Sequence, residues 1–137
     1  MTSTLRGIST VSYFAADHQA AKLWYTAFLG VEAYFDRPGY CEFRLGDYQH
    51  ELGLIDSAYV PGIQSTEGRA GVILYWHVDD IEAVVQKSVA MGARPLEPIQ
   101  DRGHGFITAT VLDPFGNILG VMRNPHYLDV LAQRPEA

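Results

Sequence analysis

The sequence predicts an α+β protein made of two tandem βαβββ modules. Two observations support this prediction. A strand-like segment that leads into an acid-capped amphipathic helix occurs twice, and the two capping residues, Asp17 and Asp80, lie 63 positions apart in a chain of 137 residues. Each helix is then followed by three strand-like segments separated by turn residues. A pattern that repeats at almost half the chain length indicates duplication of one structural unit.

The first module is expected over residues 8–56. A strand over Val11–Asp17 leads into a helix whose apolar residues, from Ala20 to Phe28, recur every three or four positions. Asp17 suits the N-cap, and Gly30 suits the end of the helix because glycine adopts a left-handed conformation at no steric cost. The three strands expected after the helix are Glu32–Phe35, Tyr40–Leu45 and His50–Ile55, the last two joined by a turn at Gly46-Asp47.

The second module is expected over residues 71–124. Its strand, Gly71–Val78, precedes the cap Asp80 and an apolar stripe that ends at Gly92. Proline and Gly-Asn between the last two strands suit a tight turn over Asp113–Asn117. The three strands expected after this helix are Arg94–Ile99, Phe106–Leu112 and Ile118–Met122.

Two further segments complete the organisation. Residues 57–70 contain Pro61, glycine, serine and threonine, which predicts a linker between the modules. Residues 125–137 form a C-terminal tail, in which His126–Leu131 can form a short helix with Pro125 at its first position. The whole chain, 1–137, is expected to form a single domain.

Composition narrows the classes of partner. The net charge of -6 and the pI near 5.2 argue against a nucleic-acid partner or an anionic membrane, since phosphate binding needs a basic face. No apolar run approaches the roughly 18 residues of a membrane span, and the N-terminal residues lack the apolar core of a signal peptide. One cysteine, Cys41, allows no intramolecular disulfide, which favours a reducing compartment. We therefore expect a cytoplasmic protein.

The motifs resemble the vicinal oxygen chelate (VOC) superfamily, which contains glyoxalases, bleomycin-resistance proteins and extradiol dioxygenases. The resemblance covers residues 8–124 and depends on three motifs. These are the acid-capped helix with its aromatic pair Trp24-Tyr25 and Leu29-Gly30 end, the second cap at Val78-Asp79-Asp80, and the Asp113–Asn117 hairpin. It implies curved, barrel-like mixed sheets with helices on the outside, a ligand cavity within them, and pairing of chains into homodimers.

The resemblance also implies four metal-ligand positions, two in each module. A histidine is expected seven residues before each capping aspartate, and a glutamate in the last strand of each module. Thr10 and Ile73 occupy the first pair of positions, and Gly53 and Gly120 the second. None of these four side chains binds a divalent metal in this way, so we expect no metal and no other cofactor. Glycine at two of these positions is expected to open volume in the cavity.

Strand alternation identifies the side chains that line the expected cavity. Residues two apart on a strand share a face, so Glu51 lies on the face of Gly53, and His77 lies on that of Ile73. Glu51 and His77 are candidates for a polar contact to a ligand, for an acid/base pair, or for a structural hydrogen bond at the rim. Arg44 can meet a ligand carboxylate or pair with a nearby acid. The candidate ligand-binding residues are Thr10, Ser12, Phe14, Arg44, Glu51, Gly53, Ile73, Tyr75, His77, Gly120 and Met122.

Three functions fit these observations. The first is metal-free binding of a small aromatic molecule, as in the drug-binding, antibiotic-resistance branch of the family, and the acidic composition tolerates a cationic ligand. The second is a lyase, isomerase or dioxygenase that uses a displaced divalent metal or a metal-independent acid/base pair. The third is an accessory protein whose cleft binds a partner or a regulatory ligand. Because one fold supports many activities, the three functions can be distinguished only by the geometry and chemistry of the site residues.

Overall fold

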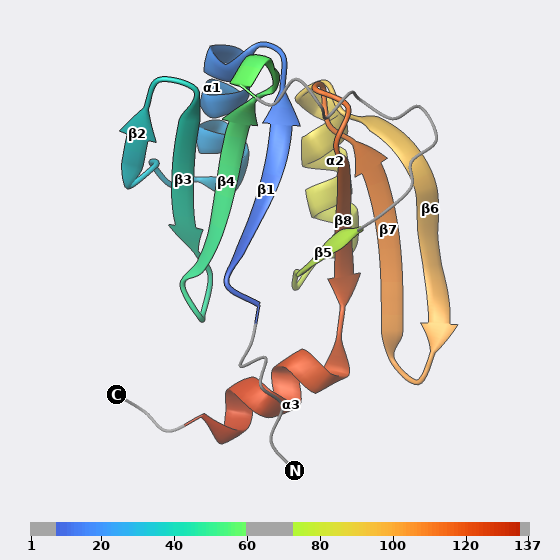
Figure 1. The fold of residues 1–137 in the computed structure, drawn as a ribbon. Coiled ribbons are helices and arrows are strands. Elements are labelled where there is room, and N and C mark those ends of the chain that lie inside the picture. The colour runs from blue at the N-terminus through green and yellow to red at the C-terminus, as the bar shows by residue number, and fades with distance from the viewer. Residues whose placement is uncertain (1–7, 60–72, 135–137) are drawn as a thin grey trace. The chain divides into compact units, whose positions relative to one another are not determined.

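A computed structural model describes residues 8–59 and 73–134 of the chain. The chain divides into two compact units, Met1–Ser65 and Thr66–Ala137. Each unit contains one four-stranded sheet and is described by itself (Figure 1). No helix among the described residues is long and apolar enough to cross a membrane.

The first unit has the predicted βαβββ order. Its sheet has the strand order β1-β4-β3-β2, in which β1 is parallel to β4 and the other neighbours are antiparallel. Because β1 and β2 are both edge strands, the sheet is open and not a closed barrel. The elements are β1 (Thr10–Ala15), α1 (His18–Leu29), β2 (Phe35–Arg37), β3 (Tyr40–Leu45), β4 (His50–Asp56) and the 3-10 helix η1 (Ser57–Tyr59).

The second unit repeats this topology. Its sheet has the order β5-β8-β7-β6, with β5 parallel to β8 and the remaining pairs antiparallel. The same strand order in both units confirms the prediction of two βαβββ modules. The elements are β5 (Leu74–His77), α2 (Ile81–Ala90), β6 (Arg94–Gly103), β7 (Phe106–Leu112), β8 (Ile118–Arg123) and α3 (Pro125–Gln133).

Both predicted helix caps are present. The Asp17 carboxylate accepts from the Ala20 amide at 3.0 Å, and the Asp80 carboxylate accepts from the Ala83 amide at 3.1 Å. Gly30 ends α1 with a φ of 75°, in the left-handed region that favours glycine. The predicted terminal helix is also confirmed, with Pro125 in its first turn and Asn124 as its cap.

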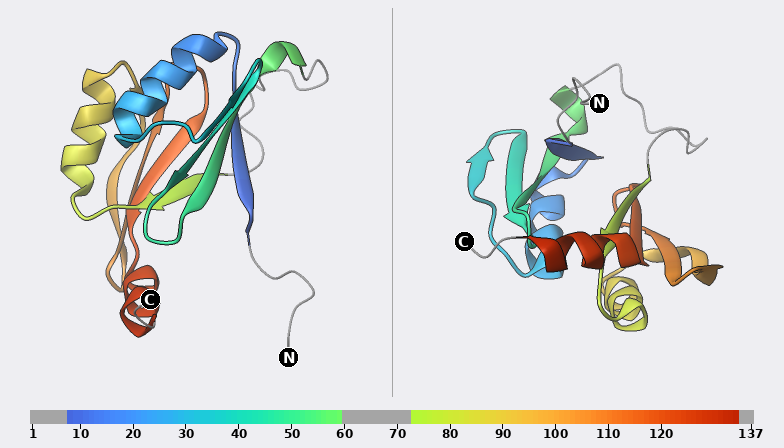
Figure 2. Two further views of the ribbon diagram at one scale, coloured as in Figure 1. Left: turned by 90° about the vertical axis from the view of Figure 1, so that its left-hand side faces the viewer. Right: turned by 90° about the horizontal axis from the view of Figure 1, so that it is seen from below.

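One face of each sheet is buried under a helix. Figure 2 shows α1 along one face of the first sheet and α2 along one face of the second. In the first unit the buried helix residues Ala21, Tyr25 and Phe28 belong to the same core as five strand residues. These are Tyr13, Cys41, Phe43, Leu52 and Leu54. In the second unit Ile81 packs with Ala109 and Val121.

Some strand bounds differ from the prediction. β2 begins at Phe35 and not at Glu32, because pairing with β3 starts at the Phe35–Glu42 pair. β6 continues to Gly103, four residues beyond the predicted Ile99, because pairing with β7 extends to Phe106 through register shifts. β5 begins at Leu74, and Gly71 and Val72 lie outside the described residues, as does the linker beyond Tyr59.

Candidate functional site

Within the described residues of the first unit, one face of the sheet has no helix packed on it. Alternation places the buried residues of β1, β3 and β4 against α1 and puts the residues between them on the opposite side. The strand register brings Thr10 beside Glu51, Ser12 beside Gly53 and Phe14 beside Ile55, so the predicted sharing of one face is confirmed. We call this surface the helix-free face. Its residues are Thr10, Ser12, Phe14, Tyr40, Glu42, Arg44, Glu51, Gly53 and Ile55.

Glu51 is the centre of a hydrogen-bonded cluster on the helix-free face. Its Oε2 accepts from the Tyr34 hydroxyl at 2.8 Å and from Arg44 Nε at 3.0 Å, and Oε1 lies 3.5 Å from the Thr10 hydroxyl. The Arg44 guanidinium also lies 4.0 Å from the centre of the Tyr34 ring. Of the alternatives open for Arg44, the structure therefore supports pairing with a nearby acid. The same contacts hold Glu51 in a fixed orientation.

Tyr40 and Glu42 form a second group on this face. The Tyr40 hydroxyl donates to Glu42 Oε1, and Glu42 lies directly across from Gly53 in the β3–β4 pairing. Burial raises the pKa of the Glu42 carboxyl, and the nearby Glu51 carboxylate raises it further, while Arg44 opposes both effects. Burial and Glu51 also raise the pKa of Tyr40. The pKa of each group therefore lies above the value of the free side chain.

The space beside Gly53 is occupied. A Cβ built on Gly53 would come within 2.6 Å of the Tyr40 hydroxyl oxygen. A Cβ on Gly120 would come within 2.6 Å of the Tyr75 ring and 2.8 Å of the Leu74 carbonyl oxygen. The expectation that these glycines open cavity volume is thus wrong at both positions, because a tyrosine ring fills the space in each module.

The second module places Tyr75 and His77 on the face opposite α2. Tyr75 pairs with Gly120, and His77 pairs with Met122. The interleaved residue Trp76 pairs with Val121, which belongs to the core under α2. Ile73 precedes β5 and is 41% exposed.

His77 attaches α3 to the second sheet. The Asn124 amide donates to its Nδ1 at 3.1 Å, and the Tyr127 ring stacks on the imidazole at 4.7 Å between centres. The His77 side chain is 9% exposed. Because Nδ1 accepts, the neutral ring carries its proton on Nε2, which finds no hydrogen-bond partner among the described residues. The contacts that are present support a structural role for His77.

The residues at the four implied metal positions do not fit a metal centre. Thr10 contacts Glu51, Ile73 is apolar, and the two glycines lie under tyrosine rings. Within residues 8–59 and 73–134, no three His, Cys, Asp or Glu side chains are grouped so that they could hold a metal ion. A carboxylate ligand at position 53 would first require the Tyr40 ring to move, and at position 120 both the Tyr75 ring and the Leu74 carbonyl oxygen block a side chain.

Sequence reasoning missed Tyr34, Tyr40 and Glu42. A signal for two of them was available, because Tyr40, Glu42 and Arg44 alternate on one strand and Arg44 was already a candidate. Tyr34 belongs to the predicted strand Glu32–Phe35 but lies just before β2 in the structure, so strand alternation does not assign it to this face. Its contact with Glu51 depends on how the segment after α1 returns to the sheet.

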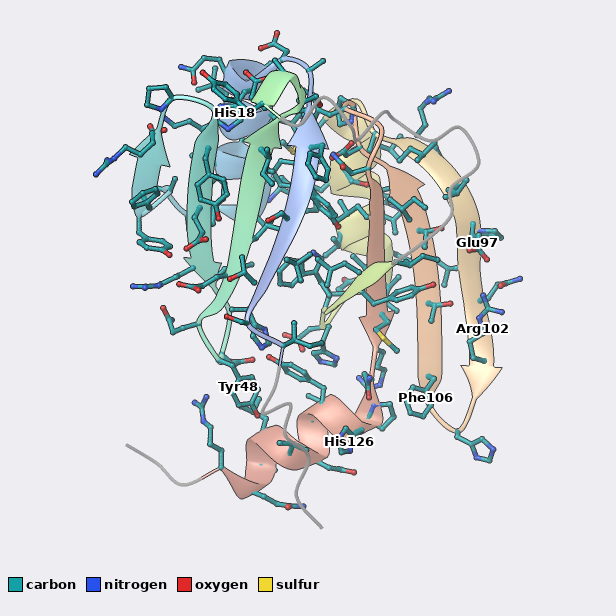
Figure 3. The ribbon with its side chains drawn as sticks, viewed as in Figure 1. His18, Tyr48, Glu97, Arg102, Phe106 and His126 are labelled. Atoms are coloured by element: carbon teal, nitrogen blue, oxygen red, sulfur yellow. The ribbon has the colours of Figure 1, made fainter. Side chains whose placement is uncertain are left out.

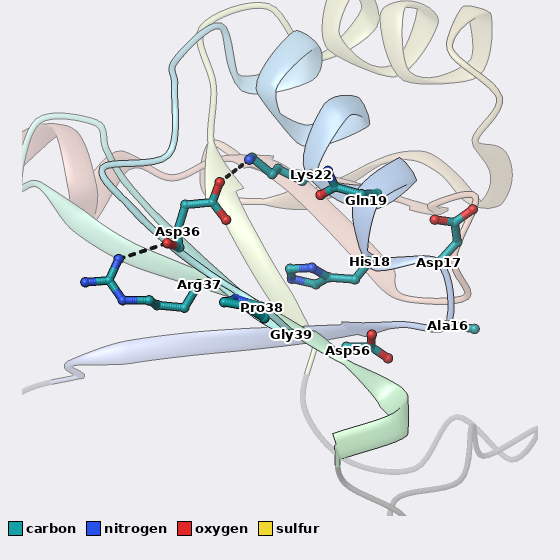
Figure 4. A pocket seen from close by; sticks show the side chains of 10 residues that line it. All are labelled: Ala16, Asp17, His18, Gln19, Lys22, Asp36, Arg37, Pro38, Gly39 and Asp56. Atoms are coloured by element: carbon teal, nitrogen blue, oxygen red, sulfur yellow. Dashed lines mark hydrogen bonds and ion pairs between the residues drawn. The ribbon is translucent and has the colours of Figure 1, made fainter.

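The first unit also has a polar hollow away from this face. Figure 3 shows His18 at the start of α1 and Tyr48 in the β3–β4 turn, at opposite ends of the first module. The hollow lies at the His18 end, is open to solvent and has a volume of about 880 Å³. Its lining comes from the start of α1, from β2 and the turn after it, and from the end of β4 (Figure 4).

The strand order and the covering helix of each unit define a duplicated βαβββ protein with curved, open mixed sheets. The family model of the Glyoxalase/Bleomycin resistance protein/Dioxygenase superfamily matches residues 7–121, and the chain belongs to this superfamily. The resemblance of the sequence to this group is thereby confirmed. No curated protein matches the sequence.

Solved structures show the same fold. Protein ATC0852 from Agrobacterium tumefaciens has a TM-score of 0.72 at 22% identity, covering 87% of this chain and 98% of its own. A glyoxalase-related enzyme from Fulvimarina pelagi has a TM-score of 0.68 at 20% identity, with coverage of 88% and 90%. Lactoylglutathione lyase from Agrobacterium tumefaciens has a TM-score of 0.67 at 20% identity, with coverage of 89% and 96%. These likenesses concern the fold alone.

Proposed function

We propose that this chain binds a small aromatic molecule on the helix-free face of its first module, without a metal ion, as a drug-binding or resistance-type protein. The observation that carries the proposal is the position of Tyr40. Its ring lies over Gly53 and its hydroxyl bonds to Glu42, so a ring and a carboxyl group stand where the family resemblance implies a metal ligand.

Aromatic side chains around this face supply surface for stacking. Tyr34 is 44% exposed and Phe35 is 38% exposed, and the Phe35 and Tyr40 rings meet edge to face at 6.2 Å. Arg44 lies over Tyr34 at 4.0 Å, and Arg37 lies over Phe35 at 4.7 Å. The arginines cover one face of each of these rings, so a planar ligand would stack against the exposed parts of Tyr34 and Phe35 that the arginines leave open.

The carboxyl groups favour a ligand with positive charge. Arg44 pairs with Glu51, while Glu42 accepts a hydrogen bond from the neutral Tyr40 hydroxyl. A cation bound beside Glu42 would favour its ionised form and offset the burial that raises its pKa. We therefore expect a planar aromatic cation to bind more tightly than a planar aromatic anion.

A metal-independent lyase or isomerase is the second candidate. The observation that favours it is the Tyr40–Glu42 hydrogen bond together with the raised pKa of Glu42, because a carboxyl group of this kind can exchange a proton closer to neutral pH. One structural neighbour is a lactoylglutathione lyase. The predicted pair of Glu51 and His77 is a weaker basis, since both side chains make structural contacts.

The proposal also covers the oligomeric state of the chain in solution. Family resemblance favours a homodimer, which light scattering after size-exclusion chromatography would test. The cytoplasm is the proposed compartment, because Cys41 is free and buried.

Ligand binding can be tested with two probes of similar size and opposite charge, proflavine and fluorescein. Proflavine should raise the melting temperature and fluorescein should not, since a ligand at 100 times its Kd adds about 2.7 kcal/mol to the free energy of unfolding. Glu42→Gln should weaken proflavine binding, whereas Asp129→Asn on α3 should leave it unchanged. Equal binding of both probes, or of proflavine to Glu42→Gln, would contradict the proposed site.

Metal analysis of the purified protein separates the proposal from the family's metal chemistry. We expect less than stoichiometric Fe, Mn, Ni and Zn, and no change in proflavine binding after dialysis against EDTA. A tightly bound metal at one ion per chain would overturn the metal-free proposal.

A further inference from the structure

The helix α3 is attached to the second module through its first turn. It follows β8 and lies beyond the end of that strand instead of covering a face of the sheet (Figure 1). None of its nine residues is buried within the described parts of the chain. A helix this short has little stability of its own in water, so its position depends on the contacts at its start. These contacts are made with His77.

His77 holds the start of α3 in its neutral form. Its Nδ1 accepts from the amide of Asn124, the N-cap of α3, at 3.1 Å, and its ring stacks on Tyr127 at 4.7 Å with 12° between the planes. A ring nitrogen that accepts a hydrogen bond carries a lone pair, so the proton of the neutral ring is on Nε2. The side chain is only 9% exposed, and Nε2 has no hydrogen-bond partner among the described residues.

A second proton on His77 is incompatible with this arrangement. It has to bind to Nδ1, where it would face the Asn124 N–H, because both nitrogens of the imidazolium ring are donors. The hydrogen bond would then be replaced by two opposed donors. The charged ring would also be almost fully buried, and burial of a charge costs free energy unless a partner compensates for it. Proton binding to His77 and docking of the start of α3 therefore compete.

The carboxylate nearest to the ring does not relieve this conflict. Asp79, between β5 and α2, places Oδ1 4.0 Å from His77 Nε2, and its side chain is fully exposed. An ion pair with an exposed carboxylate is weakened by water. It would also form at Nε2, the nitrogen that carries a proton already, so the two donors at Nδ1 would remain opposed.

The strands beside His77 direct their charged residues elsewhere. Arg123 pairs with a β7 residue that packs on the core under α2, so alternation places Arg123 on the opposite face of the sheet. Arg102 is on β6, at the far edge of the sheet from β5, and pairs with Glu97. Tyr75 shares the face of His77, but tyrosine is neutral between about pH 5 and pH 8.

The helix α3 itself contains one other group that gains charge in mild acid. His126 is exposed in the first turn, and a cation at a helix N-terminus is unfavourable. It is therefore the alternative source of a pH effect on α3, which a test has to separate from His77. Asp129 is two positions from Tyr127, and residues at this spacing do not share a side of a helix.

We propose that His77 is a pH-sensitive switch for the C-terminal helix, in which the neutral ring holds the start of α3 against the second module and protonation releases it. Histidine is the side chain that ordinarily changes charge between about pH 5 and pH 8, so release is expected in mild acid. The switch needs no ligand and no residue of the first module. It is therefore independent of the proposed aromatic ligand.

Hydrogen exchange of the Asn124 amide in the full-length protein measures the switch, because this proton exchanges after its bond to Nδ1 breaks. The protection factor, which corrects for the effect of pH on the intrinsic rate, should fall between pH 8 and pH 5. Once the released ring is protonated, each further pH unit should lower it about tenfold, since release then takes up one proton. The Val78 amide, which donates to the Met122 carbonyl at 2.9 Å, is the internal control and should keep its protection.

Three variants identify the titrating group. His77→Asn keeps an acceptor bonded to Cγ, as Nδ1 is, but does not titrate, so the protection of the Asn124 amide should become independent of pH. His77→Phe keeps a ring for Tyr127 but has no acceptor, so protection should be low at every pH. His126→Gln removes the other histidine and should retain the full pH dependence.

Each alternative outcome contradicts the switch. The proposal is overturned if the protection of the Asn124 amide does not change with pH, if Val78 loses protection in parallel, or if His77→Asn keeps the dependence. Loss of the dependence in His126→Gln would assign the effect to the helix start instead. Higher protection in acid that Asp79→Asn removes would also overturn the proposal, because an ion pair would then hold the protonated ring in place.

Discussion

The ring of Tyr40 lies over Gly53 so closely that a Cβ on the glycine would come within 2.6 Å of the tyrosine hydroxyl oxygen. Tyr75 has the same relationship to Gly120 in the second module, where the Leu74 carbonyl oxygen also lies 2.8 Å from the Cβ position. The difference matters because the end of a side chain can rotate away, while a backbone carbonyl in a sheet cannot.

Alanine at these two glycines should therefore destabilise the protein to different extents. We expect Gly53→Ala to lower the free energy of unfolding by about 1 kcal/mol and Gly120→Ala by about 2–3 kcal/mol, the range found for overpacked sites. Urea unfolding followed by fluorescence measures both changes. Equal losses of unfolding free energy in Gly53→Ala and Gly120→Ala would contradict the role assigned to the Leu74 carbonyl.

A double-mutant cycle isolates the Tyr40 contact. In a Tyr40→Ala background, Gly53→Ala should cost almost nothing, because the atoms that block the Cβ are gone. Gly120→Ala should keep its full cost in that background. If Gly53→Ala is just as damaging without the Tyr40 ring, the contact is not the cause.

The raised pKa of Glu42 predicts a dependence of stability on pH. Burial is the main cause, so the unfolded chain releases this proton at a lower pH than the folded protein does. Stability that is fully present below the unfolded value, about 4.3, is lost as the pH rises through the raised folded pKa. Glu42→Gln is neutral throughout, so wild type should lose stability relative to Glu42→Gln as the pH rises from about 4 toward neutral.

Thermal unfolding of both proteins across this pH range checks the prediction. Glu97→Gln is a suitable control, because Glu97 is an exposed carboxylate in an ion pair with Arg102 on β6. The difference in melting temperature between Glu97→Gln and wild type should not increase in this direction as the pH rises. A constant gap between wild type and Glu42→Gln would show that the carboxyl titrates alike in both states.

Cys41 should be unreactive in the folded protein. Its side chain is fully buried between α1 and the sheet, and burial raises the pKa of the thiol to about 11. Because the thiolate is the reacting species, Ellman's reagent at pH 8 should label the native protein at least about a hundredfold more slowly than the protein in urea. Rapid labelling without denaturant would mean that this core opens readily.

The two helix caps should contribute equally to stability. Asp17→Ala and Asp80→Ala should each lower the free energy of unfolding by about 1 kcal/mol, since each removes one hydrogen bond to an otherwise unpaired amide. Asparagine at either position keeps the acceptor and should cost only a few tenths of a kcal/mol. Chemical denaturation of the four variants tests this, and a neutral alanine variant would contradict the capping role.

Local features of this fold follow from the sequence. The caps at Asp17 and Asp80, the helix end at Gly30 and the bounds of β3 and β7 all match the prediction. Each depends on residues within a few positions of one another, so the sequence carries the information directly. Alternation along β1 and β4 likewise identified which side chains share the helix-free face.

The contacts around the candidate sites depend on tertiary structure, because they join residues far apart in the sequence. Tyr40 covers Gly53 from 13 positions away along the chain, Tyr34 reaches Glu51 across 17, and the His18 ring finds the Leu54 carbonyl across 36. Local pattern cannot predict such contacts, because they depend on how the chain returns after each turn. Sequence pattern alone was sufficient to predict the family, the two modules and the identity of the residues at the four implied metal positions. Only the tertiary structure shows that tyrosine rings occupy the space beside Gly53 and Gly120, and that His18 at the start of α1 lines a polar hollow.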